Sequence, residues 1–245
     1  MIDGDQGRTN LDQERIKVYY RRILPTMRKP VVAALVLLSL LAVAHASGPA
    51  ITDDQVLAAI TPLDKVDAAG IARLKAMGPQ VLSPLVRIYK KSSEDDRAVL
   101  ACILYSLGWT SPEAKAALLA DIHTQNANLR PQVQWALGRV SGDADVVETL
   151  AGIMRNDPNP LFRDKAACAL ASDQIHLCEK QKVQLFAKLI AALDDPKPQV
   201  RAIAIQALNI HTGQKKGFDP NGAPDDRNTA IARWKIWLAV YEKNL

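Results

Sequence analysis

The residues that could do chemistry gather in one short stretch, 172–182. Asp173, His176 and Cys178 fall within six residues there, and carboxylate, imidazole and thiolate groups all bind zinc. Their spacing matches no standard zinc site. A loop that contacts a partner, or plain variation in length, explains the stretch as well. We therefore expect no bound metal.

The sequence lacks the other common motifs of catalysis. His123, His176 and His211 are far apart, and none forms a His-Glu pair or has a second histidine four residues away. There is no Gly-x-Ser-x-Gly elbow, no glycine loop for phosphate and no Cys-x-x-Cys. Pairs of adjacent aspartates fall near expected helix ends, where they complement the helix dipole. They are 53–54, 95–96, 194–195 and 225–226. We predict no catalytic residues, no cofactor and no enzymatic activity.

Four arginines mark an internal repeat. They are Arg97, Arg130, Arg163 and Arg201, and each stands seven residues before a leucine, namely Leu104, Leu137, Leu170 and Leu208. The arginines are separated by 33, 33 and 38 residues. The third and sixth residues after each arginine are apolar, which is the helical spacing of a buried face. A period of this size predicts stacked helix pairs, and the extra five residues of the last interval fall within 172–182.

The helical patterns predict an all-α protein. No Asn-Gly turn joins two alternating apolar runs, so strands are not expected. Ser111 before Pro112 is a typical helix start, and Asp-Pro at 157–158 and 195–196 marks the turn inside a pair. The expected pairs are 80–89 with 95–107, 112–123 with 129–140, 145–155 with 161–171, and 183–193 with 199–210.

One face of the second helices is a candidate binding surface. It holds the first, fifth and eighth residues after each arginine, opposite the apolar arc. If these helices line the inner side of a curved stack, a partner would contact this face. Tyr105, Trp135 and Gln206 are the candidates that we select, because aromatic residues dominate many interfaces.

The Asp-Pro turn followed by residues 200–208 resembles a HEAT repeat in its short bacterial form. The likeness covers roughly 80–210. It implies an α-solenoid, in which helix pairs stack into a curved rod and the second-helix arginines support packing between neighbours. The first two copies depart from the pattern, with Ser92-Ser93 and Gln125-Asn126 at the turn. HEAT-type metal hydroxylases rely on His-Glu dyads, which this chain lacks.

Both ends of the array are expected to be caps. Residues 47–79 form the N-terminal cap, 80–211 the four repeats, and 212–245 a loop with a capping helix. The last helix carries Trp234 and Trp237 on one side, and a similar closing segment occurs in many bacterial HEAT-repeat proteins. We expect these tryptophans to seal the core, with ligand stacking as the alternative.

The chain has three cysteines, Cys102, Cys168 and Cys178. Because the number is odd, at least one thiol stays unpaired. Cys168 and Cys178 could bridge a helix to the loop after it. Cys102 and Cys168 are equivalent positions two repeats apart, which is beyond the reach of a disulfide. The alternative to the bridge is three reduced, partly buried thiols.

Residues 1–46 resemble a secretory signal peptide. Four basic residues precede the apolar stretch Val31–Val43, and Ala44-His45-Ala46 follows it. We predict cleavage after Ala46 and a periplasmic or secreted bacterial protein. The alternative is a retained anchor, but this stretch of 13 residues is shorter than the roughly 20 of a spanning helix. Met27 is an alternative start.

The charge of the chain lies mostly in this signal. Seven of the 31 basic and four of the 26 acidic residues fall within 1–46, which leaves 24 and 22. Nucleic-acid binding is therefore not expected. We predict an exported, non-enzymatic scaffold that binds a protein or extended peptide. The alternatives are a small-molecule or tetrapyrrole-binding protein, since phycobilin lyases also use HEAT-like repeats, and a structural spacer of the cell envelope.

Overall fold

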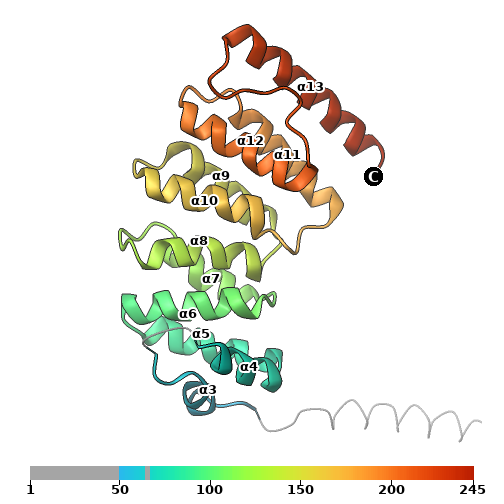
Figure 1. Ribbon diagram of the computed structural model, residues 1–245. Helices are drawn as coiled ribbons and strands as arrows, with labels where there is room; N and C mark the ends of the chain where they lie inside the picture. The colour runs from blue at the N-terminus through green and yellow to red at the C-terminus, as the bar shows by residue number, and fades with distance from the viewer. Residues whose placement is uncertain (1–49, 64–66) are drawn as a thin grey trace, which may run out of the picture. The chain divides into compact units, whose positions relative to one another are not determined.

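The computed structural model describes residues 50–63 and 67–245, so the predicted signal peptide lies outside the described residues. These residues contain eleven α-helices, one short 3-10 helix and no strand, which confirms the all-α class. The helices, labelled as in Figure 1, are α3 (Asp53–Ile60), α4 (Ala68–Met77), α5 (Leu82–Lys91), α6 (Glu94–Leu107), α7 (Pro112–Asp121), α8 (Leu129–Val140), α9 (Ala144–Asn156), α10 (Pro160–Ser172), α11 (Glu179–Ala192), α12 (Pro198–Thr212) and α13 (Pro224–Lys243). The 3-10 helix spans Pro79–Val81.

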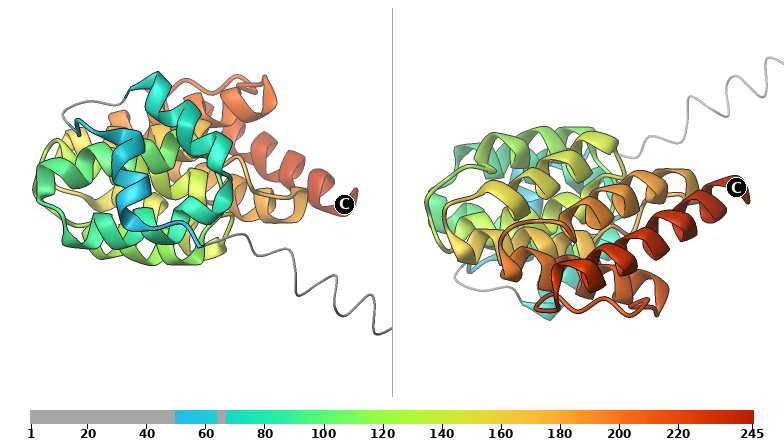
Figure 2. Two further views of the ribbon diagram at one scale, coloured as in Figure 1. Left: turned by 90° about the horizontal axis from the view of Figure 1, so that it is seen from below. Right: turned by 90° about the horizontal axis from the view of Figure 1, so that it is seen from above.

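The helices of the unit Ile51–Leu245 pack as antiparallel pairs in two layers (Figures 1 and 2). The even-numbered helices α4, α6, α8, α10 and α12 each pack on the next, and we call their outer surface the even-helix face. In the odd-numbered layer, α3, α5 and α7 form one run and α9, α11 and α13 another. Between α7 and α9 contacts are sparse, so only the even-numbered layer is continuous.

The repeated apolar positions form the core. Leu104, Leu137, Leu170 and Leu208 are completely buried. The third and sixth residues after each arginine are buried as well, and several of them are alanines, which let neighbouring helices approach closely. The register that defined the repeat therefore corresponds to the contact surface between helices.

Local sequence sets the helix ends. The Ser111 hydroxyl accepts a hydrogen bond from the Ala114 amide, as expected for an N-cap before proline. In the Asp-Pro turns, Asp157 and Asp195 accept from the backbone amides two residues later. These side chains satisfy amides that a helix start would otherwise leave unpaired.

The last two repeat arginines, Arg163 and Arg201, hold the Asp-Pro turns of their own helix pairs. Arg163 donates to the carbonyls of Asp157 and Pro158, at 2.7 and 3.1 Å. Arg201 makes the equivalent bonds to Asp195 and Pro196 and also donates to Pro220 of the closing segment. Apart from the bond to Pro220, these bonds lie within one helix pair and not between neighbouring repeats.

The first two arginines instead form ion pairs with the next helix pair. Arg130 forms an ion pair with Asp157, and the Arg97 guanidinium lies 3.4 Å from the Asp121 carboxylate. Each pair joins a second helix to the first helix, or the turn after it, of the following repeat.

Aromatic residues close the C-terminal end. Trp234 is fully buried, and the rings of Trp237 and Tyr241 pack edge-on against Phe186 of α11, at 5.2 and 5.3 Å between centroids. The Trp237 and Tyr241 rings stack on each other. The tryptophans therefore seal the end of the core, as expected.

Candidate interaction surface

The even-helix face carries a shallow hollow of about 420 Å³, and Trp135 is one of its lining residues. Helices α6, α8 and α10 and the turn before α8 form it. Its lining residues are Ala98, Val99, Cys102, Ala127, Asn128, Pro131, Gln132, Trp135, Leu161 and Lys165. Most of these side chains are apolar or uncharged, so the hollow suits a largely apolar contact.

The repeat register explains why these residues meet. Ala98 and Pro131 are the first residues after their arginines, and Cys102 and Trp135 are the fifth. Because α6 and α8 pack side by side, equivalent positions become neighbours. The predicted face thus supplies four of the lining residues, and Leu161, which is 40% exposed, adds an apolar rim that sequence reasoning missed.

Lys165 is the sole charged residue of this lining among the described residues. Its Nζ lies 5.7 Å from the centre of the Trp135 ring and 3.0 Å from the Asp164 carboxylate. A cation over an indole ring is favourable and orients the ring. Trp135 is therefore supported from α10 and remains partly exposed.

The thiols near the hollow are not activated. Partial burial raises the pKa of Cys102, which lines the hollow, and that of Cys168 on α10. Both are therefore protonated near neutral pH, whereas the thiolate is the reactive form. All three cysteines are free thiols, so the possible bridge between Cys168 and Cys178 is not formed in the structure.

The other two selected residues lie outside the hollow. Tyr105 is held by Arg139, whose Nη2 donates to the phenol oxygen at 3.2 Å and whose guanidinium lies 4.6 Å from the ring centre. Gln206 is exposed on α12, beyond α10. Of the three candidates, Trp135 alone is placed in the hollow.

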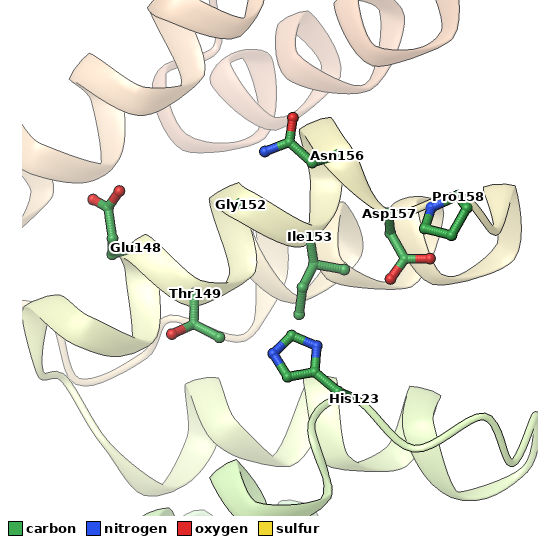
Figure 3. Close-up of a pocket in the computed structure, with 8 residues that line it drawn as sticks. All are labelled: His123, Glu148, Thr149, Gly152, Ile153, Asn156, Asp157 and Pro158. Atoms are coloured by element: carbon green, nitrogen blue, oxygen red, sulfur yellow. The ribbon is translucent and has the colours of Figure 1, made fainter.

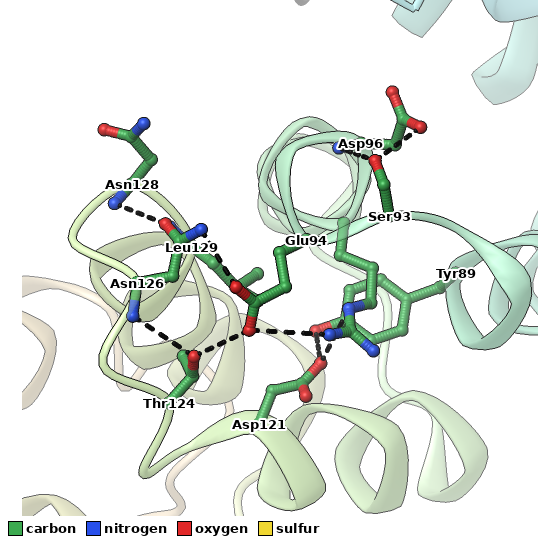
Figure 4. A network of polar contacts seen from close by, with 10 residues as sticks. Tyr89, Ser93, Glu94, Asp96, Asp121, Thr124, Asn126, Asn128 and Leu129 are labelled. Atoms are coloured by element: carbon green, nitrogen blue, oxygen red, sulfur yellow. Dashed lines mark hydrogen bonds and ion pairs between the residues drawn. The ribbon is translucent and has the colours of Figure 1, made fainter.

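A polar network positions the turn that supplies Ala127 and Asn128 (Figure 4). The Asn126 side chain accepts from the amides of Asn128 and Leu129, replacing the aspartate of the later turns. Glu94 of α6 accepts from Thr124 and Asn126, at 2.9 and 3.2 Å. These bonds lower the pKa of Glu94, that from Asn126 most, so the carboxylate stays ionised and holds the turn.

Tyr89 and Asp121 anchor the base of the same network (Figure 4). The Tyr89 hydroxyl donates to Asp121 at 2.6 Å. Burial, and next the hydrogen bond to Asp121, raise the pKa of Tyr89, so the phenol remains a donor at any ordinary pH. The turn at Gln125-Asn126, which lacks Asp-Pro, is therefore fixed by side chains from the preceding repeat.

The stretch 172–182 folds onto the ends of α6 and α8. Asp173 is buried against Arg139, and His176 Nε2 lies 2.9 Å from the carbonyl oxygens of both Gly108 and Arg139. The described residues contain no group of three His, Cys, Asp or Glu side chains that could hold a metal. The extra residues therefore bind the ends of two neighbouring helices together, and we call the segment 172–182 the clasp. The spacing of the repeat did not reveal this role.

Two glycines of the neighbouring segment make this clasp possible. A Cβ on Gly138 would lie 2.6 Å from the Gln174 side chain and 2.7 Å from the Asp173 carbonyl oxygen. A Cβ on Gly142 would lie 2.7 Å from the His176 carbonyl oxygen. This close approach explains Gly138 in the last turn of α8, and the glycines are the sequence signal that could have indicated it.

A second hollow, also about 420 Å³, lies where α7 and α9 separate (Figure 3). His123 reaches it from the turn that follows α7, and α9 supplies Thr149, Gly152 and Asn156. Nothing lies within 4 Å of a Cβ placed on Gly152, so the floor is open. Of its acids, Glu148 pairs with Lys188 and Asp157 with Arg130, so neither is set up as a free base.

No helix in residues 50–63 and 67–245 combines the length and apolar character needed to cross a membrane. No model of a known protein family matches the sequence. No curated protein is significantly similar to it.

Proposed function

We propose that this protein is a HEAT-like α-solenoid that binds another protein, or an extended peptide, on its even-helix face. The observation that carries the proposal is the apolar hollow around Trp135. A partly exposed tryptophan among mostly apolar side chains is a common centre of binding energy in protein interfaces. The layered helix pairs, and the ion pairs of Arg97 and Arg130 that join one pair to the next, support the solenoid interpretation.

The layout of the face favours a long occupant. Helices in contact have axes about 8–10 Å apart, so a segment that crosses them meets the same register position in each. The fifth-residue row runs Cys102, Trp135, Cys168 and Gln206. All of its members are partly or fully exposed. A partner segment anchored at Trp135 would therefore extend over its neighbours in this row.

The proposal includes action outside the cytoplasm. It rests on the basic residues, the apolar stretch Val31–Val43 and the small residues up to Ala46. A scaffold with protonated thiols and no activated nucleophile in its hollow fits binding better than catalysis.

Site-specific photocrosslinking tests both parts. A benzophenone amino acid in place of Gln132, inside the hollow, should give a discrete adduct in cells that naturally make the protein. The matched position is Ala187, which is exposed on α11 and should give none. Trp135→Ala should abolish the Gln132 adduct, with circular dichroism as the check on folding. Mass spectrometry of the adduct should find Ser47 as the first residue.

Three results would oppose the proposal. Equal adducts from both positions would indicate random contact, and an adduct unaffected by Trp135→Ala would remove the hollow as the binding centre. An N-terminus upstream of Ser47 would remove signal cleavage while leaving the binding surface in place.

A further inference from the structure

The outer side of α13 differs from that of an ordinary capping helix. A terminal helix of a repeat array is expected to present polar residues to solvent. Ile236 is 66% exposed and Val240 is 54% exposed, and these are the two most exposed large hydrophobic side chains of the described residues. Both lie on the side of α13 that faces away from α11, because the buried residues Ala230, Ile231 and Trp234 occupy the other side.

The outer side follows the spacing of a coiled-coil seam. Its residues are separated by alternating intervals of four and three along the helix. They are Asp225, Thr229, Ala232, Ile236, Ala239 and Lys243, and all six are exposed. The seam thus has an acidic start, an apolar middle and a basic end.

We propose that α13 pairs with α13 of a second copy of this chain, antiparallel and across a two-fold axis. In that alignment Ala232 of one copy faces Ile236 of the other, so a small side chain meets a large one at both contacts. Asp225 faces Lys243 of the second copy, also twice. The described residues place no ion-pair partner within 4.0 Å of either Asp225 or Lys243 in its own chain.

Complementarity of charge and size is what selects a second copy. A two-fold contact requires one surface to fit itself, and this seam does so because its acidic and basic ends exchange places in the antiparallel alignment. The helix dipoles also oppose each other. Arg233 and Lys235 flank the two-fold axis, and each lies opposite the same residue of the second copy. The repulsion between these like charges opposes association. One helix pair is also a small interface, so the dimer should be concentration-dependent.

Sedimentation velocity of the purified protein, from about 1 μM to about 500 μM, tests the proposal. The wild-type protein should change from monomer to dimer within this range. Ile236→Asp should leave a monomer throughout. The matched control is Ile210→Asp, because Ile210 is 52% exposed on α12, away from the seam, and this variant should dimerise normally.

A charge exchange tests the alignment itself. Asp225→Lys and Lys243→Asp should each raise the dissociation constant about three- to tenfold, because each creates two like-charge contacts. The double variant should return it to within about twofold of the wild type. Circular dichroism of each variant verifies that α13 remains helical.

Four outcomes would overturn the proposal. They are a monomer at every concentration, a dimer that survives Ile236→Asp, a helical double variant that does not recover, and binding of the Ile236 surface to anionic lipid vesicles in place of dimerisation. The last outcome would assign the surface to a membrane, because an amphipathic helix with lysines at its edges also suits a lipid surface.

Discussion

The two junctions on either side of α7 and α8 use the same repeat register but are held together differently. At the first junction both layers are in contact, α5 with α7 and α6 with α8. At the second, α8 packs on α10 while α7 and α9 separate and leave the hollow of Figure 3. In the odd-numbered layer this junction is joined by the ion pairs of Lys115 in α7 with Asp143 and Asp145, so its helix packing comes from the even-numbered layer.

The contact between α8 and α10 is also the more polar one. The Arg130 side chain is 2% exposed and that of its partner Asp157 is 8% exposed, whereas the equivalent Arg97 side chain is 23% exposed. Gln134 is completely buried, and neither its side-chain nitrogen nor its oxygen has a hydrogen-bond partner. Ala101 is the equivalent residue of α6, so one repeat position is apolar in one helix and polar in the next.

This contrast shows that the register alone does not set the stability of a repeat junction. Gln134 lies one turn after Arg130 and one turn before Gly138, on the stripe of α8 that meets α10 and the segment after it. A buried amide without hydrogen-bond partners lowers the free energy of unfolding. Removing either member of a buried ion pair also lowers it strongly, because the other charge is left buried and unpaired. The middle of the array is therefore where single substitutions should act most strongly.

The largest expected effect comes from Arg130→Ala. This substitution leaves the buried Asp157 carboxylate without its cation and removes the guanidinium that lies 4.1 Å from the Phe162 ring centre. We expect the free energy of unfolding to fall by about 3–5 kcal/mol. Arg97→Ala should cost only about 1 kcal/mol, because Asp121 keeps its bond from Tyr89. Urea unfolding measures both, and equal losses would contradict the distinction between the junctions.

The second effect has the opposite sign. Gln134→Leu removes two unpaired polar atoms from the α8–α10 contact and should raise the free energy of unfolding by about 1–3 kcal/mol. The reverse change at the first junction, Ala101→Gln, should lower it, because Ala101 is completely buried. If Gln134→Leu destabilised the protein in the same urea experiment, the amide would have to be bonded in solution, for example to an internal water.

Much of the fold could be predicted because the repeat couples spacing to burial. The arginine-to-leucine interval located the second helices closely, and α8 begins and ends at the predicted residues Leu129 and Val140. The error was larger for α11, which begins at Glu179 and not Val183. Its start is fixed by a local bond, from the Cys178 amide to the Gln181 side chain, that periodicity does not encode.

The candidate site could be predicted only in part, for a related reason. Periodicity gives the side of a helix, so it placed Trp135 on the even-helix face with its neighbours in the hollow. Periodicity does not give the partners of a side chain. It therefore did not show that Tyr105 accepts a hydrogen bond from Arg139 and lies outside the hollow. The hollow between α7 and α9 arises from a separation of two helices, for which neither helix carries a local signal.

The smallest expected effect concerns Asp173, in the clasp that follows α10. Burial raises the pKa of Asp173, although the Tyr105 hydroxyl and Arg139 act in the opposite direction. The folded state therefore binds this proton more tightly than the unfolded state does. The free energy of unfolding should therefore fall as the pH rises from the ordinary aspartate pKa to the raised pKa of Asp173. Above the raised pKa, this carboxyl lowers it no further.

Asp173→Asn removes the titration and keeps the shape of the side chain. The free energy of unfolding of the wild-type protein should therefore decline relative to the variant across this acidic window, and the difference should become constant at higher pH. Parallel curves for the two proteins would mean that the carboxyl is solvated when ionised, and that the clasp opens around Asp173. Asp96→Asn, at the N-cap contact of Ser93 in the first repeat, supplies a matched acid outside the clasp.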